Sequence, residues 1–306
     1  MSTPRTAPDK PPESFAQQIE RLRQRGMLVD DEAQAAHYLG HLNYYRLRGY
    51  RMHFECQLPG QPESYRPGTR FADVITLYDF DRRLRLETND AIERVEVSLR
   101  THWAHALAVH TGSCIAHRDP RLFNEHHDKL LAHVENVYGE RSEVFLKRYL
   151  DRGEEPPIWA LCEVLSLGQL SKWLSSIRHH RLRADIAAAY AIHEAPLCSF
   201  VRQLAFVRNV CAHHGRLWNR QLLVGTLMLP KKPQVLADQL QHAADGKDRI
   251  YNTLTLLAWL MRHVSPGSTW RGKMRRLLEE RPDLWAGMGC PAGWNTFDIW
   301  RDEVAE

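Results

Sequence analysis

The sequence of 306 residues predicts an all-α protein. Apolar residues recur at intervals of three and four in several long runs, which is the spacing of one buried helix face. No segment shows the clean alternation of apolar and polar residues that is typical of a half-buried strand. An apolar share of 43% and a charged share of 25% are typical of a globular protein with a buried core.

Composition argues against several classes of protein. The chain has no run of 18 apolar residues, so no membrane-spanning helix is expected. Residues 1–13 lack the apolar centre of a signal peptide and are expected to form a short disordered lead. A net charge of +4 permits RNA binding without requiring it. The six Cys are scattered without a C-x2-C pair, which argues against a zinc site or a disulfide framework and favours the cytoplasm.

Two short helices are predicted near the N-terminus, at residues 14–25 and from Asp30 or Asp31 to Leu39. Their apolar residues fall on one face, and an Asp before the second helix is a favoured N-cap. With the segment that follows, they make up a small N-terminal helical region, residues 14–55.

The segment HLNYYRLRGYR interleaves three Tyr with three Arg. Such side chains can stack on bases and bind phosphates. The open alternative is that the Tyr rings close a small helical core while the Arg side chains are solvated. The candidates for RNA contact in this segment are Tyr44, Tyr45, Arg46 and Arg48.

A loop rich in Pro and Gly at residues 56–70 is the best internal boundary, and the main helical domain is expected to span residues 71–306. An apolar stripe runs from residue 71 to about 109, and because this exceeds the usual helix length we expect a kink or break near residues 88–90. The acidic residues along its charged edge, expected to form mostly solvated pairs, are Asp79, Asp81, Glu87, Glu93 and Glu96.

The rest of the main domain alternates helical runs with breaks. Trp159 and Trp173 are expected in the core, and the His-rich residues 113–130 have a poor spacing for metal ligands. The other expected helical segments are residues 130–150, 158–177, 184–192, 199–212 and 252–264, and one basic helix within 269–306.

The segment RNVCAHHGRLWNR, residues 208–220, concentrates three Arg, two adjacent His, two Asn and a Trp after an apolar helical run. His can take or give a proton near neutral pH. Arg stays charged and matches a phosphate with its planar fork, and Asn can orient a neighbouring group. These groups suffice to cleave RNA without a metal or other cofactor: a His takes the 2′-hydroxyl proton and Arg stabilises the charge as the 2′-oxygen attacks phosphorus. The products would be a 2′,3′-cyclic phosphate and a 5′-hydroxyl.

The spacing of this segment does not suit a regular helix. Arg208 and His213 are five residues apart, which separates them by about 140° around a helix axis and about 7.5 Å along it. Either the helix loosens or ends near Ala212, with Gly215 as its terminator, or a second copy of the chain completes the site.

Arg208-Asn209-x-x-x-His213 resembles the R-x4–6-H motif of the HEPN superfamily of ribonucleases. The wider segment resembles the Abi (abortive infection, AbiD/AbiF-like) family of bacterial proteins. Further strings that resemble this family, between about residues 15 and 295, are NYYRLRGY, LYDFDRRLR, AIERVEVSLR, PIWALCEVLSLGQLS and MGCPAGW.

This resemblance implies an all-α, HEPN-like helical bundle with a small N-terminal helical region and additional C-terminal helices. It also implies RNA as ligand, phage defence by RNA damage, and kinship with the nuclease domains of RNA-targeting CRISPR effectors. A homodimer is implied as well, in which two R-x4-H segments face one another. Trp218 and the apolar face near Val201–Val210 are the candidates for that dimer contact.

We therefore assign catalytic roles within this segment. Arg208 would hold the phosphate, His213 would act as general acid or base, and Asn209 would orient one of them. Arg100 and His105 share the same spacing and are a candidate second pair. The residues expected to line the site, bind RNA or fix the loop are His214, Arg216, Trp218, Asn219 and Arg220.

Three functions fit this sequence. The first is a metal-independent endoribonuclease of phage defence. The second is a non-catalytic RNA-binding protein that carries a small RNA, in which the same Arg side chains bind phosphates. The third is a scaffold in which His213 and His214 cap a helix C-terminus, where cations are favoured.

Overall fold

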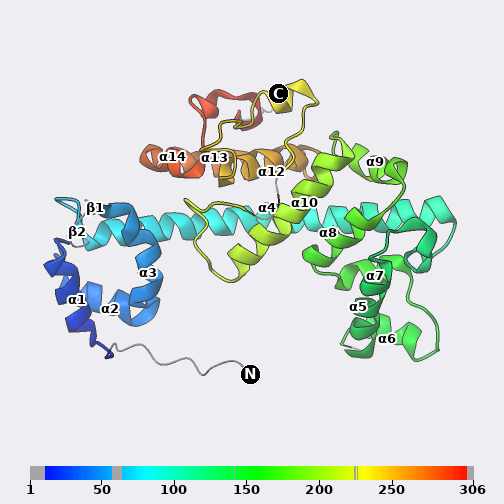
Figure 1. The fold of residues 1–306 in the computed structure, drawn as a ribbon, viewed down its shortest axis with the longest axis horizontal. Helices are drawn as coiled ribbons and strands as arrows, with labels where there is room; N and C mark the ends of the chain where they lie inside the picture. The colour runs from blue at the N-terminus through cyan, green and yellow to red at the C-terminus, as the bar shows by residue number, and fades with distance from the viewer. Residues whose placement is uncertain (1–10, 57–63, 141, 224, 226, 302–306) are drawn as a thin grey trace. The chain divides into compact units, whose positions relative to one another are not determined.

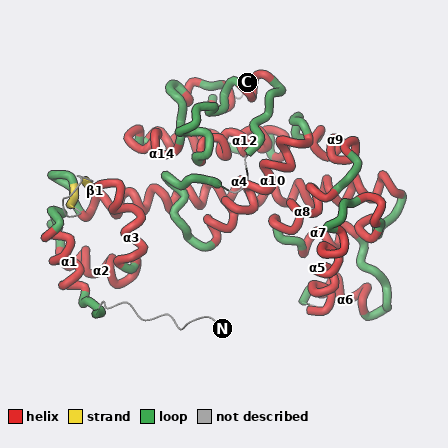
Figure 2. The backbone as a smooth tube through the Cα atoms, in the orientation of Figure 1, coloured by secondary structure: helices red, strands yellow, loops and turns green. Residues whose placement is uncertain are grey.

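The computed structural model describes residues 11–56, 64–140, 142–223, 225 and 227–301. Most of the disordered lead expected at residues 1–13 lies outside them. The regular elements of the described chain are helices, apart from two short strands, β1 (Glu55–Cys56) and β2 (Ser64–Tyr65), which pair antiparallel with Glu55 opposite Tyr65 (Figures 1 and 2). The predicted all-α class is therefore confirmed.

Two compact units make up the chain, one of residues up to Arg82 and one of residues from Arg83 onward. The division falls inside the long helix α4 (Phe71–Thr111). The boundary expected at residues 56–70 lies N-terminal to it.

The first unit begins with two capped helices. In α1 (Phe15–Gln24), Ser14 and Gln17 form a reciprocal capping box that satisfies backbone donors of the first turn. In α2 (Glu32–Leu42), the Asp31 side chain accepts a hydrogen bond from the backbone of Gln34 at 2.8 Å. Both helices thus begin where the sequence predicts.

The aromatic segment forms α3 (Tyr44–Arg51), followed by a 3-10 turn (Met52–Phe54). Tyr50 is buried and donates to Asp81 at 2.7 Å, and the guanidinium of Arg51 lies 3.9 Å from the centre of the Tyr44 ring. Tyr50 therefore belongs to the core and Tyr44 is half-buried, but Arg51, which the core interpretation places in solvent, is buried at 1% exposure. Asp81, expected to be solvated, is fully buried, because the Tyr50 hydroxyl replaces its water.

Helix α4 continues through residues 88–90 without the break expected there. The side chains of the residues that suggested a break form their polar contacts within the helix. The Thr88 hydroxyl donates to the carbonyl of Leu84 at 2.6 Å, and Asp90 pairs with Arg94 one turn away at 3.1 Å. Neither side chain therefore competes with the helical backbone for hydrogen bonds.

The second unit surrounds a buried helix, α12, in which every side chain from Ile250 to Met261 is buried. Helix α10 packs against α8, α9 and α12 (Figure 1). The bidentate contact of Arg83 with Glu280, at 2.5 and 2.6 Å, ties the α4 part of this unit to the C-terminal helices. The helices after α4 are α5 (His127–Glu140), α6 (Val144–Leu150), α7 (Ile158–Val164), α8 (Leu167–Ser176), α9 (His180–Ala188), α10 (Glu194–Ala212), α11 (Gln234–Ala237), α12 (Ile250–Val264), α13 (Trp270–Glu279) and α14 (Trp285–Met288). The short 3-10 turns of this unit are η2 (Ala116–Arg118), η3 (Pro120–Leu122), η4 (Pro282–Leu284), η5 (Trp294–Thr296) and η6 (Asp298–Trp300).

Of the two Trp expected in the core, only Trp173 is buried, at 1% exposure. Trp159 is 54% exposed, so its expected burial is wrong. The cause is the short helix α7, which turns Ile158 and Leu161 inward. Trp159 and Glu163 lie four residues apart on its opposite face, in water.

Across the described residues, no helix combines the length and the apolar character that crossing a bilayer requires.

Candidate functional site

Helix α10 carries the R-x4-H segment at its C-terminal end, and it starts at Glu194, five residues earlier than expected. Its apolar stripe is buried within the chain, with Val201, Leu204 and Val207 all at 0% exposure. These residues pack against α8, α9 and α12. The face near Val201–Val210 is therefore covered by the chain itself, and its expected role as the dimer contact is wrong.

The C-terminus of α10 is closed by three backbone hydrogen bonds. The amides of His213, His214 and Gly215 donate to the carbonyls of Asn209, Cys211 and Val210 at 2.9, 3.1 and 2.8 Å. The last two bonds are those of a Schellman motif. The helix ends at Ala212 as predicted, but the left-handed residue is His214, with φ 55°, and not Gly215.

A left-handed backbone is unfavourable for a residue that carries a Cβ atom. The cost is about 1–2 kcal/mol for most residues, whereas glycine adopts this conformation freely. His214 is exposed, so packing does not require its ring there. Strain of this kind is often found at functional sites.

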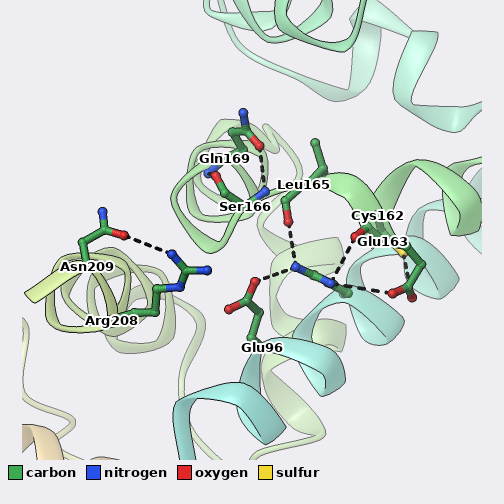
Figure 3. A network of polar contacts seen from close by, with 9 residues as sticks. Glu96, Cys162, Glu163, Leu165, Ser166, Gln169, Arg208 and Asn209 are labelled. Carbon is green, nitrogen blue, oxygen red and sulfur yellow. Dashed lines mark hydrogen bonds and ion pairs between the residues drawn. The ribbon is translucent and has the colours of Figure 1, made fainter. Parts of the chain in front are cut away.

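Arg208, Asn209 and His213 lie together at the water-accessible end of α10. Arg208 is half-buried, and its Nη1 donates to Oδ1 of Asn209 at 3.5 Å (Figure 3). His213 is exposed and follows Asn209 by one helical turn. Asn209 is therefore placed between the cation and the imidazole.

The end of the helix does not bring Arg208 and His213 face to face. With φ −90° and ψ 14°, His213 stays close to the helical path, and the chain turns away only at His214. The separation of about 140° around the axis expected for a regular helix therefore persists. The end of the helix near Ala212 therefore does not by itself bring Arg208 and His213 together. The other alternative is that a second copy of the chain completes the site.

A buried carboxylate faces this group of residues. The guanidinium of Arg208 points toward the carboxylate of Glu96 on α4 (Figure 3). Glu96 is 8% exposed and accepts a hydrogen bond from Arg100 at 2.6 Å. Its expected place among solvated pairs is wrong, because its partner Arg100 is itself held by carbonyl groups at the end of α7 and in the turn that follows. From sequence alone, Glu96 and Arg100 look like an ordinary i, i+4 pair, and Glu96 was missed for that reason.

Arg100, the cation of the candidate second pair, is committed to structure. Besides Glu96, it donates to the carbonyl of Leu165 at 2.9 Å, in the turn between α7 and α8, and to the carbonyl of Glu163 at 3.2 Å, near the end of α7. Arg100 thereby fastens α4 to that turn. His105 is exposed, but the guanidinium that would serve with it is already occupied.

Two thiols on these elements, one in α7 and one in the first half of α10, are poor nucleophiles. Burial raises the pKa of Cys162 in α7 to about 12 and that of Cys198 in α10 to about 11. Both therefore stay protonated at neutral pH, and the thiolate is the reactive form.

The segment after Gly215 fixes the loop. Trp218 is 1% exposed and its indole donates to the carbonyl of Leu284 at 3.3 Å. The Asn219 side chain accepts from Arg249 at 2.7 Å, and Arg220 donates to the carbonyl of Arg216 at 2.6 Å. Trp218 is therefore an anchor in the core, and its expected role as a dimer contact is wrong.

The Tyr and Arg residues of the first unit are divided between core and surface. Tyr45 is 81% exposed, and Arg46 and Arg48 are also exposed, whereas the Tyr44 ring lies beneath Arg51. Their contact with RNA stays a prediction.

The His-rich stretch before α5 contributes to packing. His117 is fully buried, and its ring Nε2 lies 3.0 Å from Oε1 of Glu155, while His127 Nε2 lies 2.8 Å from the carbonyl of His117. Burial lowers the pKa of His117. Among the residues that the structure describes, no three His, Cys, Asp or Glu side chains come together as metal ligands would.

A family model described as Abi-like protein matches residues 37–219, which is more than half of the chain. The matched range begins in α2, includes Glu96 and Arg100, and extends past Arg208 and His213 to Asn219. No match was found among curated proteins or among solved structures.

Proposed function

The chain belongs to the family of Abi-like proteins, which suggests a role in abortive infection, and from this premise we propose that it is a metal-independent endoribonuclease. The single observation that supports the activity is the end of α10. There, Arg208, Asn209 and His213 are accessible to water on a helix whose other face is buried. None of the three is needed to fill the core.

The reaction uses only groups present at this helix end. The His213 imidazole takes the proton of a ribose 2′-hydroxyl, and the 2′-oxygen forms a bond to the adjacent phosphorus. The bond from phosphorus to the 5′-oxygen breaks, and that oxygen takes a proton from an imidazolium or from water. Arg208 stabilises the negative charge on the phosphoryl oxygens, and Asn209 orients the Arg208 guanidinium through their hydrogen bond.

The proposed working form is a homodimer. Because Arg208 and His213 do not converge on one helix, the second α10 of a dimer would supply the missing partner of each pair. The contact cannot use Trp218 or the face near Val201–Val210 without unfolding the chain. It has to use the exposed residues near Asn209 and His213. Sedimentation velocity at micromolar concentration should show a dimer, and an active monomer would contradict this form of the proposal.

Single substitutions test the activity. Positioned general acid–base groups contribute about 10²–10⁴ in rate, so His213→Ala should slow cleavage of single-stranded RNA at least 100-fold. Because His213 is exposed, the helix content and the unfolding midpoint should not change. His110→Ala, at an exposed His near the end of α4, is the matched control and should cleave at the wild-type rate.

Two outcomes would contradict the proposal. Equal cleavage by the wild type and His213→Ala would remove the assigned base. Salt-sensitive RNA binding without product at any protein concentration would favour the alternative, an RNA-binding protein that carries a small RNA.

A further inference from the structure

A cleft of about 990 Å³ opens beside the R-x4-H segment, between α5, α8 and α10. Each helix lines it with one face, because the contributing residues recur at helical intervals. On α10 the lining residues are Arg202, Ala205, Phe206 and Asn209, so the face that reaches the cleft ends next to Arg208. The cleft and the proposed catalytic residues thus share Asn209.

Five basic groups line this cleft, and none of its described lining residues is Asp or Glu. The basic residues are His126, Lys129, His133, Lys172 and Arg202. Amide and hydroxyl groups complete the polar lining. A concave surface with charge of one sign concentrates an electrostatic field and attracts ions of the opposite sign.

The basic side chains of the cleft lack the carboxylate partners that Arg side chains elsewhere in the unit have. Among the described residues, no ion pair or side-chain hydrogen bond involves Lys129, Lys172 or Arg202, whereas Arg183 pairs with Glu194 at 2.5 Å. The ring Nε2 of His133 is buried and has no hydrogen-bond partner among the described atoms. The ring Nε2 of His126 lies 3.9 Å from Oε1 of Glu125, which is too long for a hydrogen bond.

We propose that this cleft holds single-stranded RNA on one side of the bond that is cut, an inference that rests on the proposed ribonuclease function. Lys129, Lys172 and Arg202 bind successive phosphates. Phe206, half-buried in the same lining, offers a ring on which a base stacks. The strand leaves the cleft at Asn209, which places the next phosphate beside Arg208.

The chemistry favours RNA over an acidic peptide for two reasons. The cleft continues into a segment that carries groups suited to attack by a 2′-hydroxyl, which a peptide lacks. Its lining also combines cations with an aromatic ring, as surfaces that bind single strands do.

The test measures RNA binding in the full chain carrying His213→Ala, which prevents turnover. In this background, Lys129→Gln/Lys172→Gln/Arg202→Gln removes three exposed charges of the cleft. Fluorescence anisotropy with a labelled 12-nucleotide RNA of mixed sequence should show at least a tenfold rise in Kd. The slope of log Kd against log salt should fall by about 2, because each phosphate contact on a single strand contributes about 0.7.

A matched control removes the same charge elsewhere in the unit. Lys147→Gln/Lys273→Gln/Arg276→Gln neutralises three exposed cations outside the cleft and should change Kd less than threefold. Lys129→Arg/Lys172→Arg/Arg202→Lys keeps the cleft charge and should retain binding. Equal losses in the cleft variant and the control variant would show a nonspecific charge effect and overturn the proposal.

The failure of this inference can be told apart from the failure of the proposed function. Unchanged RNA binding by the cleft variant, together with cleavage that depends on His213, would remove the cleft and keep the nuclease. RNA binding that depends on the cleft, in a protein that yields no cyclic-phosphate product, would keep the cleft and remove the nuclease. Tighter binding of a poly-glutamate peptide than of the RNA would overturn the assignment of RNA as ligand.

Discussion

Two segments of this chain carry Arg and His at the same five-residue spacing, and the structure gives them different surroundings. Arg100 on α4 is held by Glu96 and by two carbonyls, one at the end of α7 and one in the turn that follows it. Arg208 on α10 has Asn209 as its hydrogen-bond partner at the water-accessible end of its helix. The spacing alone therefore does not identify the active pair. The contacts of each guanidinium distinguish the two segments. Arg100 is a clamp that fastens α4 to the turn after α7, whereas Arg208 is placed where it can bind a phosphate.

The largest expected effect concerns activity. Arg208→Ala should slow RNA cleavage at least 100-fold, because the guanidinium stabilises charge that develops at the phosphate. His105→Ala, in the clamp segment, should change the rate less than threefold. Single-turnover cleavage of a labelled RNA measures both. A large loss in His105→Ala would mean that the α4 pair also takes part in catalysis, and the comparison would fail.

The next effect concerns stability, and here the substitution of Arg100 should have a larger effect than that of Arg208. Arg100→Ala leaves Glu96 without its partner in a mostly buried place and should lower the free energy of unfolding by about 2 kcal/mol. Arg208→Ala should change it by less than about 1 kcal/mol, because Arg208 is half-buried and Asn209 is the partner of its hydrogen bond. Urea unfolding followed by circular dichroism gives both values. Equal stability of the two variants would contradict the role of Arg100 as a clamp.

Buried His117, unlike exposed His213, should make the stability of the chain depend on pH. Burial lowers the pKa of His117 in the folded chain, so the unfolded chain binds more protons as the pH falls. The stabilisation is therefore fully present above the unfolded pKa of about 6.5 and is lost as the pH falls below it. Unfolding midpoints at pH 7.5, 6.5 and 5.5 should decline. His117→Gln should flatten this dependence, whereas His110→Gln should keep the wild-type slope. A decline that is the same in all three proteins would exclude His117 as its cause.

The smallest effect concerns the strained turn after α10. His214→Gly should raise the free energy of unfolding by about 1 kcal/mol, because glycine adopts the left-handed conformation without a steric penalty. His214→Ala keeps the Cβ atom and serves as the control, with no such gain. A less stable glycine variant would show that the imidazole of His214 contributes more to the fold than its backbone conformation costs.

Helix ends with local signals could be predicted from the sequence, and long-range surroundings could not. Ser14 and Asp31 cap their helices through contacts within three residues. Thr88 and Asp90 misled the prediction because their side chains bond within α4. Such bonds form within one turn, but whether the helix continues through these residues depends on the packing of the whole helix.

The candidate site shows the same limit. The segment from Arg208 to His213 could be found from its composition, since its chemistry is local. The burial of Glu96 could not, because its partner Arg100 is held by residues more than 60 positions away in the chain. The basic cleft could not, because residues from α5, α8 and α10 meet there. Whether Trp159 or Trp218 is buried likewise depends on partners far along the chain, and nothing near either Trp in the sequence distinguishes them.

We propose that Arg208 and His213 cut RNA through its own 2′-hydroxyl. The most direct measurement compares a labelled RNA with the same strand carrying one 2′-deoxynucleotide at the mapped cleavage position, with end-group analysis of the fragments. We expect a 2′,3′-cyclic phosphate from the RNA, no cut at the deoxy position, and no product with Arg208→Ala or His213→Ala. Cleavage at the deoxy position, or a 5′-phosphate end, would contradict it.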